Sequence, residues 1–181
     1  MYTKTLTLEN SKIQDVCIVI LSSLLIGLFG QFSFPLPFSP VPLSTQDTLI
    51  LALAILLGPK RATAAVLLFL AQGAIGLPVF ANNGTPCGLT RFVGPTGGYL
   101  LSYPIAAYLT GALSQQLPKT LLNTLLAFLA GSATMFFFGV GYLSTFVGFT
   151  KAIWLGFMPF IPGNILKTFI AMKLIGQTRS Q

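Results

Sequence analysis

Lys167 and Asn164, close to the end of the chain, have the chemistry to bind an anion. Lys167 follows Pro162-Gly163-Asn164 in the first turn of an expected apolar helix. A cation there faces the positive end of the helix dipole, and ionisable groups at membrane depth are costly and usually functional. The two side chains, three residues apart, share one helix face. We interpret Lys167 as a ligand-binding residue rather than one that snorkels to headgroups, and Asn164 as a ligand contact, a helix N-cap or both.

A second polar group lies in the long loop between residues 76 and 99. Arg91 is its only charge, and Asn82 adds an amide. Loops of this length are usually functional or disordered, and this one is too apolar for disorder, so we expect it to be ordered and to face a ligand. Arg91 could pair with a ligand or a lipid phosphate, and Asn-Asn-Gly is also a turn sequence. Phe80 and Tyr99 could form the walls of a pocket or simply pack.

Signatures of catalysis are missing. The chain has no histidine, no paired carboxylates and no H-E-x-x-H or G-x-S-x-G pattern. Residues 163–168 resemble the end of a P-loop, but Leu166 stands where a glycine should precede the lysine. The two cysteines, Cys17 and Cys87, have neither metal-site nor disulfide spacing. We therefore expect no enzyme, no metal and no cofactor; uphill movement of a solute would draw energy from a partner or a gradient.

The composition predicts an all-α, multispan membrane protein. Of 181 residues, 54% are hydrophobic and 7% charged, against about 25% charged in soluble domains. The apolar runs are long rather than alternating, which disfavours a β-barrel, and the length suggests one domain over residues 1–181. The net charge of +7 comes from basic residues scattered between apolar runs, which indicates membrane topology rather than nucleic-acid binding.

Six transmembrane helices are expected, at residues 16–34, 45–57, 62–75, 97–114, 120–141 and 164–176, with an interfacial helix within 142–162. Pro104 should kink the fourth. The second and third helices are only about 20 Å long, short of a hydrocarbon core of about 30 Å, which leaves a recess for loops. Cytoplasmic termini place seven of the ten basic residues inside. The proline-rich segment 35–47, the long loop and residues 159–164 then converge on the external side.

Two further features have plain structural interpretations. Asp47 follows Ser44 by three residues, as in a capping box at a helix start. It is also the only acid expected near the external face. Ser23 and Gly27 form a small-xxx-small pair, which allows close approach either of another protein's helix or of the chain's own helices.

Several stretches resemble the BioY family in order and spacing. They read LLGPKRA, QGAIGLPVFA, GPTGGYLLSYPIAA and PFIPGNILK, together with PVP-x-x-x-Q ending at Gln46. The resemblance covers nearly the whole chain, and GLPVF followed by GPTGGY is its most specific part. This family comprises the biotin-specific S components of energy-coupling-factor (ECF) vitamin transporters.

The resemblance implies a six-helix protein of the cytoplasmic membrane that captures biotin at an external site. The implied partners are biotin, a transmembrane T component and two ATPase subunits, within the lipid bilayer. A solitary carrier without ATPases is an alternative, and another vitamin would require that GPTGGY is misread. We expect Asn82 to meet the ureido ring and Lys167, supported by Arg91, the carboxylate. The predicted site comprises Lys167, Asn164, Arg91, Asn82, Phe80, Tyr99 and Gln46.

The chain departs from the family pattern at two places. The family usually has aspartate at the position of Asn164, so the site here is one charge more positive. The Ala-xxx-Ala surface that often docks the T component is represented only by Ser23 and Gly27.

Overall fold

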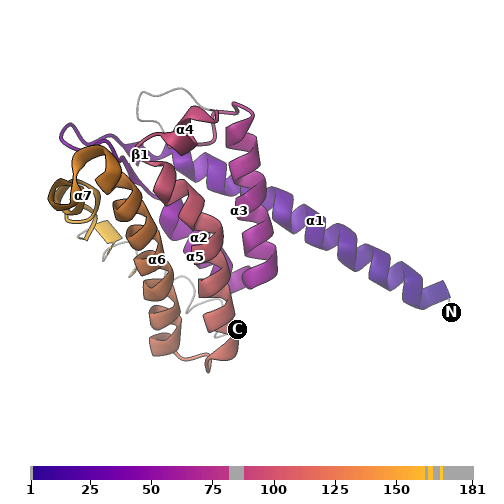
Figure 1. The fold of residues 1–181 in the computed structure, drawn as a ribbon. Coiled ribbons are helices and arrows are strands. Elements are labelled where there is room, and N and C mark those ends of the chain that lie inside the picture. The colour runs from indigo at the N-terminus through magenta and orange to yellow at the C-terminus, as the bar shows by residue number, and fades with distance from the viewer. Residues whose placement is uncertain (1, 82–87, 162, 165–167, 169–181) are drawn as a thin grey trace.

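The computed structural model describes residues 2–81, 88–161, 163, 164 and 168, with residues 2–11 described by their backbone alone. Within these residues the regular secondary structure is helical except for one pair of two-residue strands (Figure 1). The elements in order are α1 (Tyr2–Gln31), β1 (Ser33–Phe34), β2 (Leu43–Ser44), α2 (Gln46–Leu57), α3 (Pro59–Ala74), α4 (Thr90–Val93), α5 (Gly97–Gln116), α6 (Leu121–Val147) and α7 (Phe149–Gly156).

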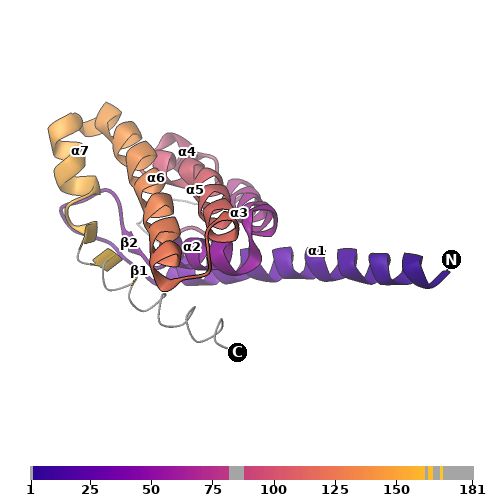
Figure 2. The ribbon, with the colours of Figure 1, turned by 90° about the horizontal axis from the view of Figure 1, so that it is seen from below.

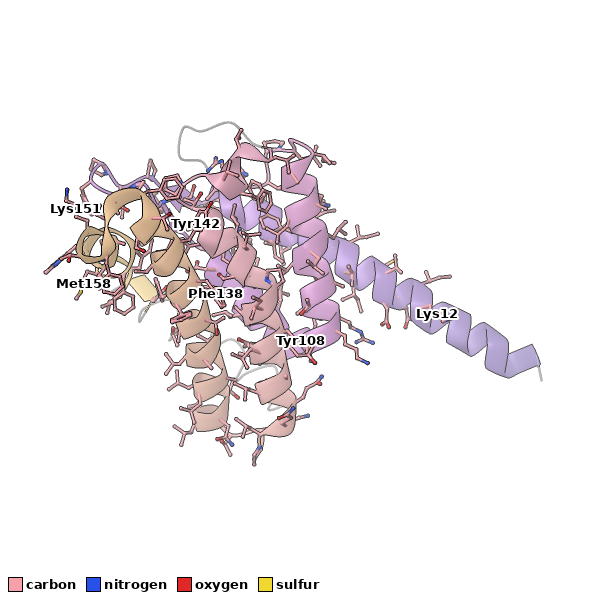
Figure 3. All side chains as sticks on the ribbon, in the orientation of Figure 1. Lys12, Tyr108, Phe138, Tyr142, Lys151 and Met158 are labelled. Carbon is pink, nitrogen blue, oxygen red and sulfur yellow. The ribbon has the colours of Figure 1, made fainter. Side chains whose placement is uncertain are left out.

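Two stretches of the described chain are long and apolar enough to cross a membrane. They are Lys12–Gln31, within α1, and Leu121–Val147, which is α6. The N-terminal half of α1 extends away from the other helices in both views (Figures 1 and 2). Large apolar side chains cover the outer surface of the bundle, among them the half-exposed Tyr108 and Phe138 (Figure 3). Such a surface suits lipid rather than water.

Helix α5 is the centre of the bundle and packs against α2, α3 and α6. Its small residues let the neighbours approach closely: a Cβ on Gly111 would lie 2.6 Å from the nitrogen of Pro59, at the α2–α3 turn. That turn matches its sequence, because α2 ends at Gly58 with φ +80° and α3 begins with a proline at its first position. Helices α2 and α3, of 12 and 16 residues, are both shorter than the roughly 20 residues of a full membrane crossing, although α3 is two residues longer than expected.

The proline-rich segment folds back on itself. Strands β1 and β2 pair antiparallel, with Ser33 opposite Ser44 and Phe34 opposite Leu43. Between them, the Ser39 hydroxyl donates to the carbonyl of Leu155 at 2.7 Å. The segment therefore connects the end of α1 and the start of α2 with the end of α7.

Several helix boundaries differ from the sequence-based expectation. Helix α1 ends at Gln31, before the strand pair begins. Helix α6 continues past Gly141, its expected end, because Leu143, two residues further on, is fully buried in the bundle. It ends at Val147, and the next residue, Gly148, has a φ of +83°.

Three further expectations have mixed outcomes. Helix α5 runs through Pro104 as a single element, and the long loop contains the unexpected α4. The predicted sixth helix, residues 164–176, lies almost entirely outside the described residues.

The structure also shows the residues that precede α2 and the small-residue pair of α1. The capping position before α2 is Thr45, whose side chain makes no capping bond, while the Ser44 hydroxyl accepts from the backbone nitrogen of Gln46 at 3.1 Å. The Ser23 hydroxyl accepts from Nε2 of Gln72 on α3 at 3.1 Å. A Cβ on Gly27 would lie 3.1 Å from the side chain of Val79. The small-residue pair of α1 is thus used by the chain's own packing.

Candidate ligand-binding site

A pocket opens where the strand pair, the starts of α2 and α5, the middle of α6 and the segment after α7 meet. The volume of its cavity is about 70 Å³. One water molecule needs about 10–15 Å³ of such volume, so the cavity as it stands holds a few waters. It is smaller than the roughly 300–1,000 Å³ that is common for small-molecule pockets, and a ligand would have to widen it.

Five of the seven predicted site residues line this pocket, although they come from three separate parts of the chain: the start of α2, residues 76–99 and the segment after α7. They are Gln46, Phe80, Arg91, Tyr99 and Asn164. The other two, Asn82 and Lys167, lie outside the described residues.

Arg91 is held inside the protein although it carries a permanent charge. The short helix α4 places it in the pocket wall, and only 5% of the residue is exposed. A guanidinium is costly to bury and needs compensating partners. This burial favours a role inside the pocket over pairing with a lipid phosphate, the two alternatives that the sequence left open.

Phe80 forms an apolar wall beside Arg91. It is 3% exposed and packs edge-on against Phe69 of α3, with ring centroids 5.4 Å apart, and against Phe92 of α4, at 5.7 Å. Edge-to-face pairs of this kind are favourable beyond their buried area. Phe80 thus ties the long loop to α3 and α4.

Tyr99 also lines the pocket, but its hydroxyl is engaged elsewhere. The ring lies edge-on to Phe136 of α6 at 6.5 Å, and the hydroxyl donates to the carbonyl of Gly156 at 2.7 Å. Ser39 donates to the preceding carbonyl, that of Leu155. The last carbonyls of a helix lack partners inside it, so these two side chains satisfy the end of α7. They hold in place the segment that continues to Asn164.

Gln46 is almost completely enclosed, with 1% of its surface exposed. Its Oε1 has no hydrogen-bond partner among the described residues. The side chain reaches α1, where a Cβ on Gly30 would lie 2.5 Å from that oxygen. Buried polar atoms are nearly always hydrogen-bonded, so this oxygen, which lies against α1, is one of the few exceptions among the described residues.

The sequence and the fold both match known proteins. The model of the BioY family matches residues 3–181. The chain belongs to the BioY family.

Relatives of this BioY chain carry transport names. Probable biotin transporter BioY from Pyrococcus horikoshii is 35% identical over 171 residues, which cover 92% of this chain and 99% of the relative. Biotin transporter BioY from Rhizobium etli is 38% identical over 159 residues and 82% of each chain. The crystal structure of the S-component for biotin from an ECF-type ABC transporter matches with a TM-score of 0.84 at 28% identity, covering 95% of this chain and 94% of the other.

Sequence reasoning missed part of the lining of this BioY pocket. The aromatic and small polar residues of α5 and α6 carry no local signal that separates them from ordinary helix packing. Asp47 did carry one, because an acid in an apolar segment is a candidate functional residue, but it was interpreted as a capping residue. The lining residues outside the prediction include Asp47, Thr96, Tyr103, Ser132, Phe136 and Phe160.

Proposed function

We propose that the protein takes up biotin and that the pocket beside Arg91 is its biotin site. The observation that carries the proposal is a pocket with a buried cation in its wall, in a chain of the BioY family. Its relatives are named biotin transporters, and the matched structure is named an S-component for biotin. Biotin carries one carboxylate on an otherwise apolar tail, which suits a buried guanidinium in an aromatic wall.

We propose six transmembrane helices in the cytoplasmic membrane, with both termini in the cytoplasm and the pocket on the external side. The strand pair, α4 and α7 lie at one end of the bundle, where the pocket opens (Figure 1). Lys60 and Arg61 at the start of α3, and Lys119 in the α5–α6 connection, lie at helix ends away from it. Basic residues favour the cytoplasmic side.

We further propose that the protein is the substrate-capture subunit of an ECF-type transporter. Its partners would be a T component and two ATPase subunits, because the matched structure is an S-component of such a transporter. The P-loop-like sequence of this chain lacks the required glycine, so ATP hydrolysis would come from those partners.

Binding of labelled biotin to the purified protein tests the site. Arg91→Gln should weaken binding by about 10- to 100-fold, because a hydrogen bond to a charged group contributes about 1.5–3 kcal/mol. The affinity for biotin amide, which lacks the negative charge, should fall by less than about threefold. Equal losses for both ligands would show that Arg91 does not contact the carboxylate. Wild-type protein that binds riboflavin or thiamine but not biotin would overturn the proposed substrate.

Lys167 and Asn82 remain proposed contacts from the sequence, and the same two ligands test them. Lys167→Ala should lower the affinity for biotin more than the affinity for biotin amide if Lys167 contacts the carboxylate. Asn82→Ala should lower both affinities equally if Asn82 contacts the ureido ring. The opposite pattern in both variants would reverse the direction of the ligand in the pocket.

One observation favours the alternative of a solitary carrier. The small-residue face of α1, at Ser23 and Gly27, is occupied by Gln72 and Val79 of the chain itself. It therefore offers no free small-residue surface for a T component. Biotin uptake in a host that lacks every ECF component would favour the solitary carrier, and uptake that appears only with T component and ATPases would favour the transporter complex.

A further inference from the structure

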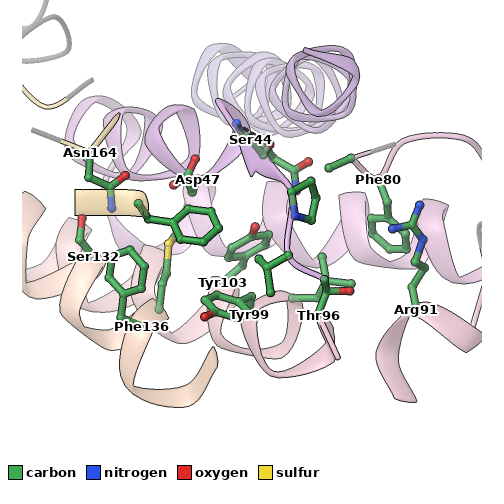
Figure 4. A pocket seen from close by; sticks show the side chains of 17 residues that line it. Ser44, Asp47, Phe80, Arg91, Thr96, Tyr99, Tyr103, Ser132, Phe136 and Asn164 are labelled. Carbon is green, nitrogen blue, oxygen red and sulfur yellow. Dashed lines mark hydrogen bonds between the residues drawn. The ribbon is translucent and has the colours of Figure 1, made fainter. Parts of the chain in front are cut away.

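Asp47 brings a negative charge into the wall of the pocket. It lies in the first turn of α2 and is partly buried. Among the described residues that line the pocket it is the only acid, and Arg91 is the only base. Figure 4 shows the two well apart, with Asn164 and Asp47 on one side of the pocket and Arg91 beside Phe80 on the other. Among the described lining residues, the negative charge therefore lies on one side of the pocket and the positive charge on the other.

Biotin has matching, unlike ends. Its ureido ring has two N–H donors and one carbonyl acceptor, whereas its tail ends in a carboxylate. An ionised aspartate is an acceptor only, with two oxygens and about four lone-pair positions. It can accept from ring N–H groups while keeping a protein partner. A ligand carboxylate on the same side would instead meet a like charge in a partly desolvated setting, where repulsion is stronger than in water.

We propose that Asp47 fixes the direction of the bound ligand by accepting hydrogen bonds from the ring N–H groups of biotin, so that the carboxylate points toward Arg91. The inference rests on the proposed function and deepens it. Asn164, on the same side as Asp47, has an amide that can donate to the ureido carbonyl. Asp47 is thus a specificity-determining residue. The carboxylate at Arg91 agrees with part of the assignment made from the sequence, which gave the carboxylate to Lys167 supported by Arg91. The ureido ring moves from Asn82 to Asp47.

The decisive variant is Asp47→Asn, which removes the charge and keeps the shape. Affinities are measured for biotin, for biotin amide and for 2-iminobiotin, whose ring is a cationic guanidinium. The affinities for biotin and biotin amide should both fall by about 10- to 100-fold, the range for a charge-assisted hydrogen bond. The affinity for 2-iminobiotin should fall further, because its cationic ring also loses its counter-charge.

Two results would overturn the inference. If the carboxylate faced Asp47, the variant would bind biotin more tightly and biotin amide unchanged. If Asp47 had no contact with the ligand, all three affinities would stay within about twofold. Wild-type protein that binds none of the three ligands would overturn the proposed function itself, and is therefore distinguishable from either result.

The matched control is Asp15→Asn, the same substitution in α1. Asp15 pairs with Arg61 of α3 at 2.7 Å, away from the pocket lining, so all three affinities should be unchanged. Unfolding without ligand checks that both variants fold. Should Asp47→Asn fail to fold, the wild-type protein decides: 2-iminobiotin binds more tightly than biotin if its ring faces Asp47, and more weakly if its ring faces Arg91.

Discussion

Replacing Tyr99 with phenylalanine tests how the end of α7 is held against the pocket. The substitution keeps the ring and its edge-on contact with Phe136 but removes the donor to the Gly156 carbonyl. That hydrogen bond is 2.7 Å long and buried, and Tyr99 is 9% exposed. We expect the variant to fold with the same architecture and lower stability.

The expected loss follows from the position of the bond. A neutral hydrogen bond contributes about 0.5–1.5 kcal/mol net, and a buried acceptor left without its donor costs about 1–3 kcal/mol. The Gly156 carbonyl is at the end of a helix, where no intrahelical donor replaces the hydroxyl. Tyr99→Phe should therefore lower the free energy of unfolding by about 1–3 kcal/mol.

Tyr142→Phe is the matched control. The Tyr142 hydroxyl lies 3.5 Å from the carbonyl of Phe92, at the limit of a hydrogen bond, so its removal should cost less than about 0.5 kcal/mol. The free energies of unfolding of both variants are measured with denaturant in mixed micelles without ligand. They are comparable when the variants have equal m-values. If the two losses agree within about 0.3 kcal/mol, the bond to Gly156 does not hold α7.

Two further predictions concern helix packing. Gly111→Ala should destabilise the protein by about 1–3 kcal/mol, because the new methyl group would overlap the backbone of Pro59. The control is Gly141→Ala, whose methyl group would have nothing within 4 Å and which should be neutral or stabilising in the same unfolding measurement. Equal effects of the two substitutions would refute the overlap. Arg61→Ala should cost less than about 1 kcal/mol, because Arg61 and Asp15 are each 47% exposed, and a loss that does not shrink at high salt would contradict a screened surface pair.

The helix boundaries show where local signals suffice. The end of α2 at Leu57 was predicted correctly, because a glycine followed by a proline is a strong local stop signal. Helix α3 begins at Pro59, three residues before its expected start at residue 62. Gly141 gave a similar signal and was wrong, because Leu143 beyond it fills a buried position that only the packed bundle creates. The strand pair was missed because its two strands are only two residues long.

The pocket shows the same division. Phe80, Arg91 and Tyr99 were chosen from one long loop, whose mixture of aromatic, basic and glycine residues is visible in the sequence. Asp47 was assigned to helix capping, because its distance along the chain from Asn164 hides that both line one pocket. The sequence could show that position 164 lacks an acid, but not that α2 supplies one to the same site.

By itself, the sequence determined the class of the protein, its short helices and its family motifs, because composition, helix length and turn residues are local properties. Only the tertiary structure decided that Ser23 and Gly27 pack internally, that the Tyr99 hydroxyl holds α7, and that Asp47 and Arg91 face one pocket from different sides. These are contacts between distant segments. They depend on how the helices pack, which no short stretch of the chain specifies.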